Sequence, residues 1–204
     1  AIGWYIDEYK IAQVSMNITD INATPLHVAF DEVCRCAQNR GVRITGTEIV
    51  GLIPKRTLIE AGKYFLEKQQ RSTGIPETDI IDIAIRSMGL SDLKPFNPRE
   101  KVIEFLLEDI DKQSRLIDLT VKHFAEETSR ESPAPGGGTI AAYMGALAAA
   151  LGTMVANMSS HKRGWDTQWE KFSRWADRGQ EQIAELLELV DEDTEAFNRI
   201  MSAF

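Results

Sequence analysis

Hydrophobic and polar residues alternate in the first part of the chain. Across residues 11–18, apolar positions are separated by Gln13, Ser15 and Asn17. A period of two is typical of a β-strand, because successive side chains of a strand point to opposite faces. The apolar run Ile2–Ile6 precedes this segment, and the polar stretch "DEYK" joins the two. We therefore predict a hairpin or two neighbouring strands.

The pattern then changes to a helical period, with one further extended run. In order, the predicted elements are a helix from Leu26 with Thr24 as its N-cap and Gly41 as its stop, a strand Val42–Ile53, a helix from Pro54 to Phe65, and a helix that ends at Gly89. This order of strands and helices predicts an α+β sandwich subdomain over residues 1–92, with helices packed on a sheet.

Residues 93–100, "LKPFNPRE", contain two prolines and are interpreted as a linker. Beyond them the period is helical throughout, over Lys101–Glu108, Ser114–Glu127, Thr139–Ser159 and Thr167–Phe204. Residues 101–204 are therefore predicted to form an all-α helical bundle domain. Since the chain begins without an initiator methionine and ends inside a helical pattern, we expect an internal piece of a longer polypeptide, with a truncated second domain.

The stretch "PAPGGGTIAAYMGALAAALGTMVANMS" is the most apolar of the chain. Its length also fits a membrane span, but its small residues, with Gly145 and Gly152 seven apart, favour a core helix that packs on every side. The glycines lack the lysine of a phosphate-binding loop. Gly136–Gly138 would expose backbone N–H groups at a helix N-terminus, which favours an anion, or would serve close packing alone.

One carboxylate interrupts the apolar seam of the last helix. The seam runs Ile183, Leu186, Val190, Asp193, Phe197, Ile200, Phe204. Burial of an unpaired carboxylate is costly, so it either finds partners or holds a proton, as a general acid must. The alternative is a structural Asp193 that is hydrogen-bonded to a neighbouring helix. Asp191, Glu192 and Glu195 lie off the seam and are expected to be solvated.

Charge and cysteine usage limit the functional classes. A net charge of −8 argues against nucleic acid as the main ligand. Cys34 and Cys36 lie two apart in a helical pattern, which suits neither a disulfide nor a zinc site and indicates a reducing cytoplasm. His27 and His123 are expected to be packing or surface residues. The basic turn His161–Arg163 could meet an anionic tail or be a solvated loop.

Several segments together resemble the formiminotransferase-cyclodeaminase family. In chain order they are "AIGWYIDEYKIAQVSMNITD", "GTEIVGLIP", "LKPFNPREKVIEFLL", "SPAPGGGTIAAYMGALAAALGTMV" and "LVDEDTEAF". The resemblance implies a bifunctional folate enzyme of histidine degradation. One activity transfers a formimino group from N-formimino-glutamate to tetrahydrofolate, and the other cyclises 5-formimino-tetrahydrofolate to 5,10-methenyl-tetrahydrofolate with release of ammonia. It further implies polyglutamylated tetrahydrofolate as substrate, no metal, and a homo-oligomer formed through the helical domain.

The resemblance also assigns roles to residues. Residues 1–92 match the C-terminal transferase subdomain, and Asp193 matches the catalytic aspartate of the cyclodeaminase. With Arg163 of the basic turn added, the expected folate-binding residues are Gly136, Gly137, Gly138, Arg163, Gln13, Ser15 and Asn17. The catalytic histidine of the transferase has no counterpart, and His27 does not match it, so we expect no formimino transfer from this segment alone. Two alternatives remain: a non-catalytic oligomerisation module with Gly145 and Gly152 as its seam, or a folate-binding module without chemistry.

Overall fold

The computed structural model describes residues 1–110, 115–131 and 134–203. Ser114 and Phe204, which bound two predicted helical segments, lie outside the described residues. So do Ser132 and Pro133, which precede the three glycines. The chain divides into two units. The first consists of residues 1–65 and 77–110, and the second of residues 66–76 with the described residues from 115 onward. Each unit is described by itself.

The first unit begins with the predicted hairpin. Strand β1 (Ile2–Ile6) pairs antiparallel with β2 (Ile11–Ser15), which confirms the alternation read from the sequence. The exposure of the two faces is unexpected, because Val14 is 52% exposed whereas Gln13 and Ser15 are half-buried. Ala12 and Val14 of β2 thus face outward, whereas Ile11 is half-buried on the same face as Gln13 and Ser15.

The predicted strand Val42–Ile53 is wrong. Residues 42–52 have no regular secondary structure, and Val50 is 87% exposed. Only Ile53 pairs, in an isolated parallel bridge with Val102. A strand needs a neighbour for its backbone N–H and C=O groups, and within the described part of the chain the sheet has two strands. The coarser prediction, a small N-terminal sheet with helices and then a helical part, is confirmed.

Helices make up the remainder of the first unit. They are α1 (Leu26–Gln38), α2 (Lys55–Lys68, of which the first unit includes the part up to Phe65), α3 (Glu77–Met88), α4 (Pro98–Lys101) and α5 (Ile103–Ile110). Pro54 precedes α2 as predicted, and Gly41 and Gly89 follow α1 and α3 with φ of 73° and 61°, conformations that glycine adopts readily. Thr24 is not an N-cap, because Pro25 occupies that position.

The core of the first unit forms where α2, α3 and the 53–102 bridge meet. Its buried residues are Ile53, Leu58, Ala61, Phe65, Ile81, Ala84, Met88, Leu90 and Val102. Gly62 allows α2 to approach α3 closely, because a Cβ there would lie 2.1 Å from the carbonyl oxygen of Ile80. Glu104 of α5 accepts a hydrogen bond from the Lys55 backbone N–H at 2.7 Å and so caps α2. The Glu104 carboxylate thus links the start of α2 to α5.

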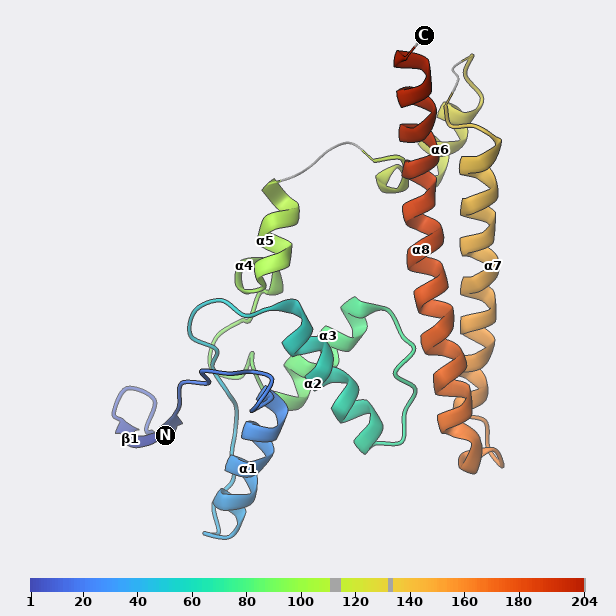
Figure 1. The fold of residues 1–204 in the computed structure, drawn as a ribbon. Coiled ribbons are helices and arrows are strands. Elements are labelled where there is room, and N and C mark those ends of the chain that lie inside the picture. Colours follow the sequence, from blue (N-terminus) through green and yellow to red (C-terminus); the bar gives the residue numbers. More distant parts are fainter. Residues whose placement is uncertain (111–114, 132–133, 204) are drawn as a thin grey trace. The chain divides into compact units, whose positions relative to one another are not determined.

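Two long antiparallel helices dominate the second unit (Figure 1). They are α7 (Gly137–Ser160) and α8 (Trp169–Ser202), preceded by the short helix Leu116–Asp118 and α6 (Val121–Thr128), and joined through the short helix Asp166–Gln168. The helices approach each other closely at Gly179, where a Cβ would lie 2.0 Å from Thr153 Oγ1. The oligomerisation seam expected at Gly145 and Gly152 concerns contacts between chains and stays a prediction. Gly145 packs on Leu186, but no described atom lies within 4 Å of a Cβ at Gly152.

Helix α7 is not buried on every side, contrary to the core-helix prediction. Ala146, Thr153 and Ala156 are buried. A stripe of large apolar side chains is exposed, and its members are Met144, Leu147, Leu151, Met154, Val155 and Met158. Among the described helices, α7 is the one long and apolar enough to cross a membrane, a test that core helices of soluble proteins also pass. In this chain α7 packs along one face.

The segment Leu66–Pro76 packs on the two long helices. The Thr73 hydroxyl donates to Asp177 Oδ2 at 2.7 Å, and Asn157 Nδ2 donates to the Gly74 carbonyl oxygen at 2.7 Å. A Cβ at Gly74 would lie 2.3 Å from the Ala176 carbonyl carbon. This contact depends on glycine, because no side chain fits between the two backbones.

Candidate functional site

The first turn of α7 is covered by a carboxylate from α8. Asp193 Oδ2 accepts one hydrogen bond from the Thr139 backbone N–H at 2.8 Å and another from the Thr139 hydroxyl at 2.9 Å. Thr139 is 0% exposed. The first N–H groups of a helix have no partner within the helix, and a carboxylate stabilises them by accepting from the N–H and by its charge. Asp193 therefore caps α7 from a second helix.

Gly138 makes room for this carboxylate. A Cβ at position 138 would lie 2.4 Å from Asp193 Oδ1, far inside van der Waals contact. By contrast, no described atom lies within 4 Å of a Cβ at Gly137. Gly136 is the N-cap residue, in an extended conformation. The three predicted glycines thus have different surroundings, and Gly138 is the one whose missing side chain the site requires.

The predicted burial of Asp193 is wrong. Its side chain is exposed, whereas Val190 is 0% exposed and Thr194 and Phe197 are half-buried. The inward-facing seam therefore runs from Val190 to Thr194, a step of four residues, and then to Phe197, a step of three. Asp193 lies beside this seam. The observed contact matches the alternative of an Asp hydrogen-bonded to a neighbouring helix, and the catalytic role of Asp193 stays a prediction.

Asp191 is a polar contact that the sequence interpretation missed. It was expected to be solvated, but it is half-buried, and its Oδ1 accepts a hydrogen bond from the Leu116 backbone N–H at 2.7 Å. Its Oδ2 is buried and has no hydrogen-bond partner among the described residues. Asp191 lies three residues before Thr194, and residues three apart are neighbours on a helix surface. This spacing was the sequence signal that Asp191 lies on the same face of α8 as the half-buried Thr194.

Arg163 lies at the other end of α7 from the glycines. It is exposed in the turn after Ser160. A helix of 24 residues is about 36 Å long, so within one chain Arg163 and Gly136–Gly138 do not form one site. In the same turn, Lys162 Nζ lies 4.4 Å from the centre of the Trp165 ring, a cation–π contact.

The neighbouring His161 is electrostatically perturbed. Partial burial, and secondly the positive charge of Arg71, lower the pKa of His161 below its ordinary value of 6.5. Both causes disfavour the imidazolium form. His161 therefore contributes less positive charge to the predicted anion-binding turn than an ordinary histidine would.

The remaining predicted folate residues belong to the first unit. Gln13 and Ser15 are half-buried on β2, and Asn17 is exposed just beyond it. Gln13 and Ser15 lie on one strand of the hairpin, and Asn17 follows that strand. Their proposed folate contacts stay predictions.

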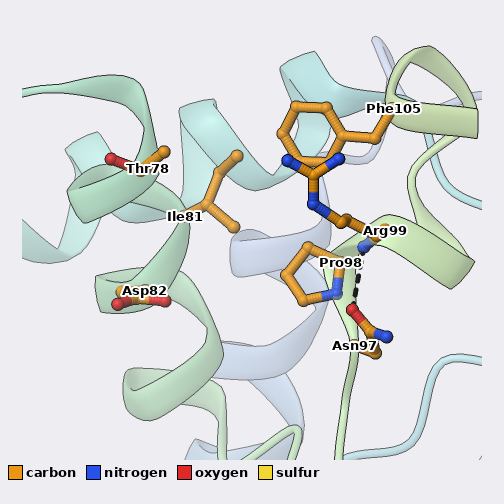
Figure 2. A pocket seen from close by; sticks show the side chains of 7 residues that line it. All are labelled: Thr78, Ile81, Asp82, Asn97, Pro98, Arg99 and Phe105. Atoms are coloured by element: carbon orange, nitrogen blue, oxygen red, sulfur yellow. Dashed lines mark hydrogen bonds between the residues drawn. The ribbon is translucent and has the colours of Figure 1, made fainter. Parts of the chain in front are cut away.

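A hollow in the first unit was not predicted. It has a volume of about 420 Å³ and lies between α3 and the α4–α5 segment (Figure 2). Its lining residues are Thr78, Ile81, Asp82, Asn97, Pro98, Arg99 and Phe105. Asn97 Oδ1 accepts from the Arg99 backbone N–H at 3.1 Å, which caps α4. Over the described residues, no group of three or more His, Cys, Asp or Glu side chains is arranged to hold a metal.

Comparison with known families explains the two regions. The family model for the formiminotransferase domain matches residues 1–108, and the model described as formiminotransferase-cyclodeaminase matches residues 120–204. The chain belongs to the formiminotransferase-cyclodeaminase family. The resemblance read from the sequence is thereby confirmed.

Curated relatives of this family extend well beyond the chain. The chain is 36% identical to the mouse (Mus musculus) formimidoyltransferase-cyclodeaminase over 202 residues, which is 99% of the chain and 37% of the relative. It is 36% identical to glutamate formimidoyltransferase of Streptococcus pyogenes over 33% of the chain and 22% of that protein. It is 29% identical to methenyltetrahydrofolate cyclohydrolase of Methylorubrum extorquens over 42% of the chain and 41% of that protein. The chain therefore spans little more than a third of the formimidoyltransferase-cyclodeaminase relative.

Proposed function

We propose that this chain is part of a bifunctional folate enzyme of histidine degradation. In this proposal the protein transfers a formimino group from N-formimino-glutamate to tetrahydrofolate. It then cyclises 5-formimino-tetrahydrofolate to 5,10-methenyl-tetrahydrofolate with release of ammonia. Family membership over both regions supports the proposal. The observation that carries the second step is the Asp193 carboxylate, whose Oδ1 lies beside Gly138 while Thr139 holds Oδ2.

Asp193 carries a proton between two nitrogens of the substrate in this proposal. Folate N10 attacks the carbon of the formimino group in its amidinium form, and the C=N electron pair moves onto the exocyclic nitrogen. Asp193 takes the proton from N10 and then donates it to that nitrogen. The C–N bond breaks, ammonia leaves, and the positive charge remains on the methenyl group. A donor is required because an amide anion is too basic to leave.

Further parts of the proposal concern folate binding and assembly. Gly136, Gly137 and Gly138 contact folate at the α7 entry, Arg163 meets its glutamate tail, and Gln13, Ser15 and Asn17 line the transferase crevice. The tetrahydrofolate is polyglutamylated, no metal takes part, and the protein is a cytoplasmic homo-oligomer that pairs through its helical domain. Residues 1–92 form an α+β sandwich subdomain, residues 93–100 a linker, and residues 101–204 a helical bundle.

A second candidate is a non-catalytic helical oligomerisation module or a folate-binding module. The exposed stripe of α7, including Leu151 and Met158, favours the first, because Met158 is 69% exposed and large apolar surfaces mark interaction sites. In that case Asp193 serves only as a cap of α7.

Replacement of Asp193 by Asn distinguishes these functions. In the complete gene product, the enzyme proposal predicts that Asp193→Asn binds folate normally but loses at least about a hundredfold in turnover. Turnover is followed as the absorbance of methenyl-folate formed from 5-formimino-tetrahydrofolate. If the variant keeps the wild-type rate, the proton-transfer role is wrong. A wild-type protein that binds no folate points to the oligomerisation module.

A further inference from the structure

Two donors of one residue converge on one oxygen of Asp193. The Thr139 backbone N–H and hydroxyl both bind Oδ2, at 2.8 and 2.9 Å. The Thr139 side chain is 0% exposed, although the carboxylate that it holds is exposed. Thr139 Oγ1 also lies 3.4 Å from Thr194 Oγ1, so it can accept from Thr194 while it donates to Asp193. The hydroxyl of Thr139 is therefore fixed in direction from both sides.

This arrangement makes the two oxygens of Asp193 unequal. Oδ2 accepts two hydrogen bonds from Thr139, so a proton on this carboxyl group has its place on Oδ1. Oδ1 is the Asp193 atom nearest to the position that a Cβ of residue 138 would take, at 2.4 Å, so it lies against the glycine backbone where a side chain is absent. We propose that Thr139 is a positioning residue that sets the orientation of Asp193 and makes Oδ1 the proton-carrying oxygen. The inference rests on the proposed cyclodeaminase function.

A purely structural role predicts a different set of effects. Capping of α7 needs only the backbone N–H of Thr139, which every substitution except proline retains. Water can replace the hydroxyl as a partner of the exposed carboxylate, so loss of the hydroxyl costs little stability. Orientation, by contrast, depends on the second donor, and small displacements of a catalytic group can lower turnover by about a hundredfold.

The experiment compares hydroxyl-free and hydroxyl-bearing variants in the complete gene product. Thr139→Val is expected to lower kcat for 5-formimino-tetrahydrofolate by about tenfold or more, with KM changed less than about twofold. Thr139→Ser retains the hydroxyl and is expected to keep kcat within about threefold of wild type. Thr153→Val is the matched control, because Thr153 is another buried threonine of α7 whose hydroxyl donates to the Ala149 carbonyl oxygen. It is expected to leave kcat unchanged.

Each outcome either supports or overturns the inference. Equal kcat values for wild type and Thr139→Val overturn it. If Thr139→Val does not fold, Thr139→Ser is compared with Thr139→Ala, which lacks the same methyl group and differs only in the hydroxyl; equal kcat values for this pair overturn it as well. Asp193→Asn separates the two proposals. If that variant is inactive while Thr139→Val is fully active, only the positioning role fails, and if Asp193→Asn is fully active, the proposed proton transfer fails first.

Discussion

Replacement of Gly138 by alanine tests the contact between α7 and Asp193 directly. The added Cβ would lie 2.4 Å from Oδ1, 2.7 Å from Cγ and 2.8 Å from Oδ2 of Asp193. An ordinary carbon–oxygen contact needs about 3.2 Å or more, so the carboxylate must retreat by nearly 1 Å. Its hydrogen bonds to Thr139, now 2.8 and 2.9 Å long, would then exceed the range in which such bonds are effective.

The magnitude follows from a comparison with Gly137→Ala in the same turn. Both substitutions gain up to about 1 kcal/mol from the higher helix propensity of alanine, and this gain cancels in the comparison. Only Gly138→Ala loses the cap, which costs about 0.5–2 kcal/mol. Gly138→Ala should therefore be less stable than Gly137→Ala by about that amount, which corresponds to roughly 1–8 °C in Tm for a protein of about 150–250 residues.

The assay measures Tm by circular dichroism and methenyl-folate formation for both variants. Gly137→Ala is expected to keep its Tm at or above that of wild type, because no described atom lies within 4 Å of the new Cβ. Gly138→Ala is expected to lose turnover by about tenfold or more, because Asp193 is displaced. Equal Tm and equal turnover for the two alanine variants would refute the proposed role of the contact.

Two further predictions concern the rest of the second unit. Gly179→Ala should lower Tm by several degrees, because its Cβ would lie 2.0 Å from Thr153 Oγ1. Gly152→Ala should raise Tm slightly, because no described atom lies within 4 Å of its Cβ. Thermal unfolding of both variants checks this, and a Gly179→Ala variant more stable than wild type contradicts the observed helix packing. The lowered pKa of His161, which partial burial and then Arg71 cause, means that the unfolded chain binds the proton first as the pH falls below about 6.5. Stability present above that pH should then decrease toward pH 5, and a His161→Gln variant with an unchanged pH profile of Tm would show that another group is responsible.

The prediction is correct for elements whose conformation depends mainly on residues close together in the sequence. The hairpin, the helices after Pro54 and before Gly89, and the long helices α7 and α8 follow from alternation, helical period and turn residues within each segment. The run Val42–Ile53 has strand composition but no strand structure. Its apolar residues satisfy the pattern, yet a strand also needs hydrogen bonds to a second segment, and the pattern contains no information on that partner.

The surroundings of Asp193 depend partly on the local sequence and partly on the tertiary structure. The sequence alone determined that this carboxylate interrupts the apolar seam of one helix and that three glycines begin a second helix. It also determined the resemblance of the chain to the formiminotransferase-cyclodeaminase family. Only the folded chain decided that Asp193 is exposed, that Thr139 holds one of its oxygens, and that Gly138 and not Gly137 must lack a side chain. Helical period specifies the direction of a side chain to within part of a turn. Burial and hydrogen bonding depend on the second helix, whose position the period of the first does not specify.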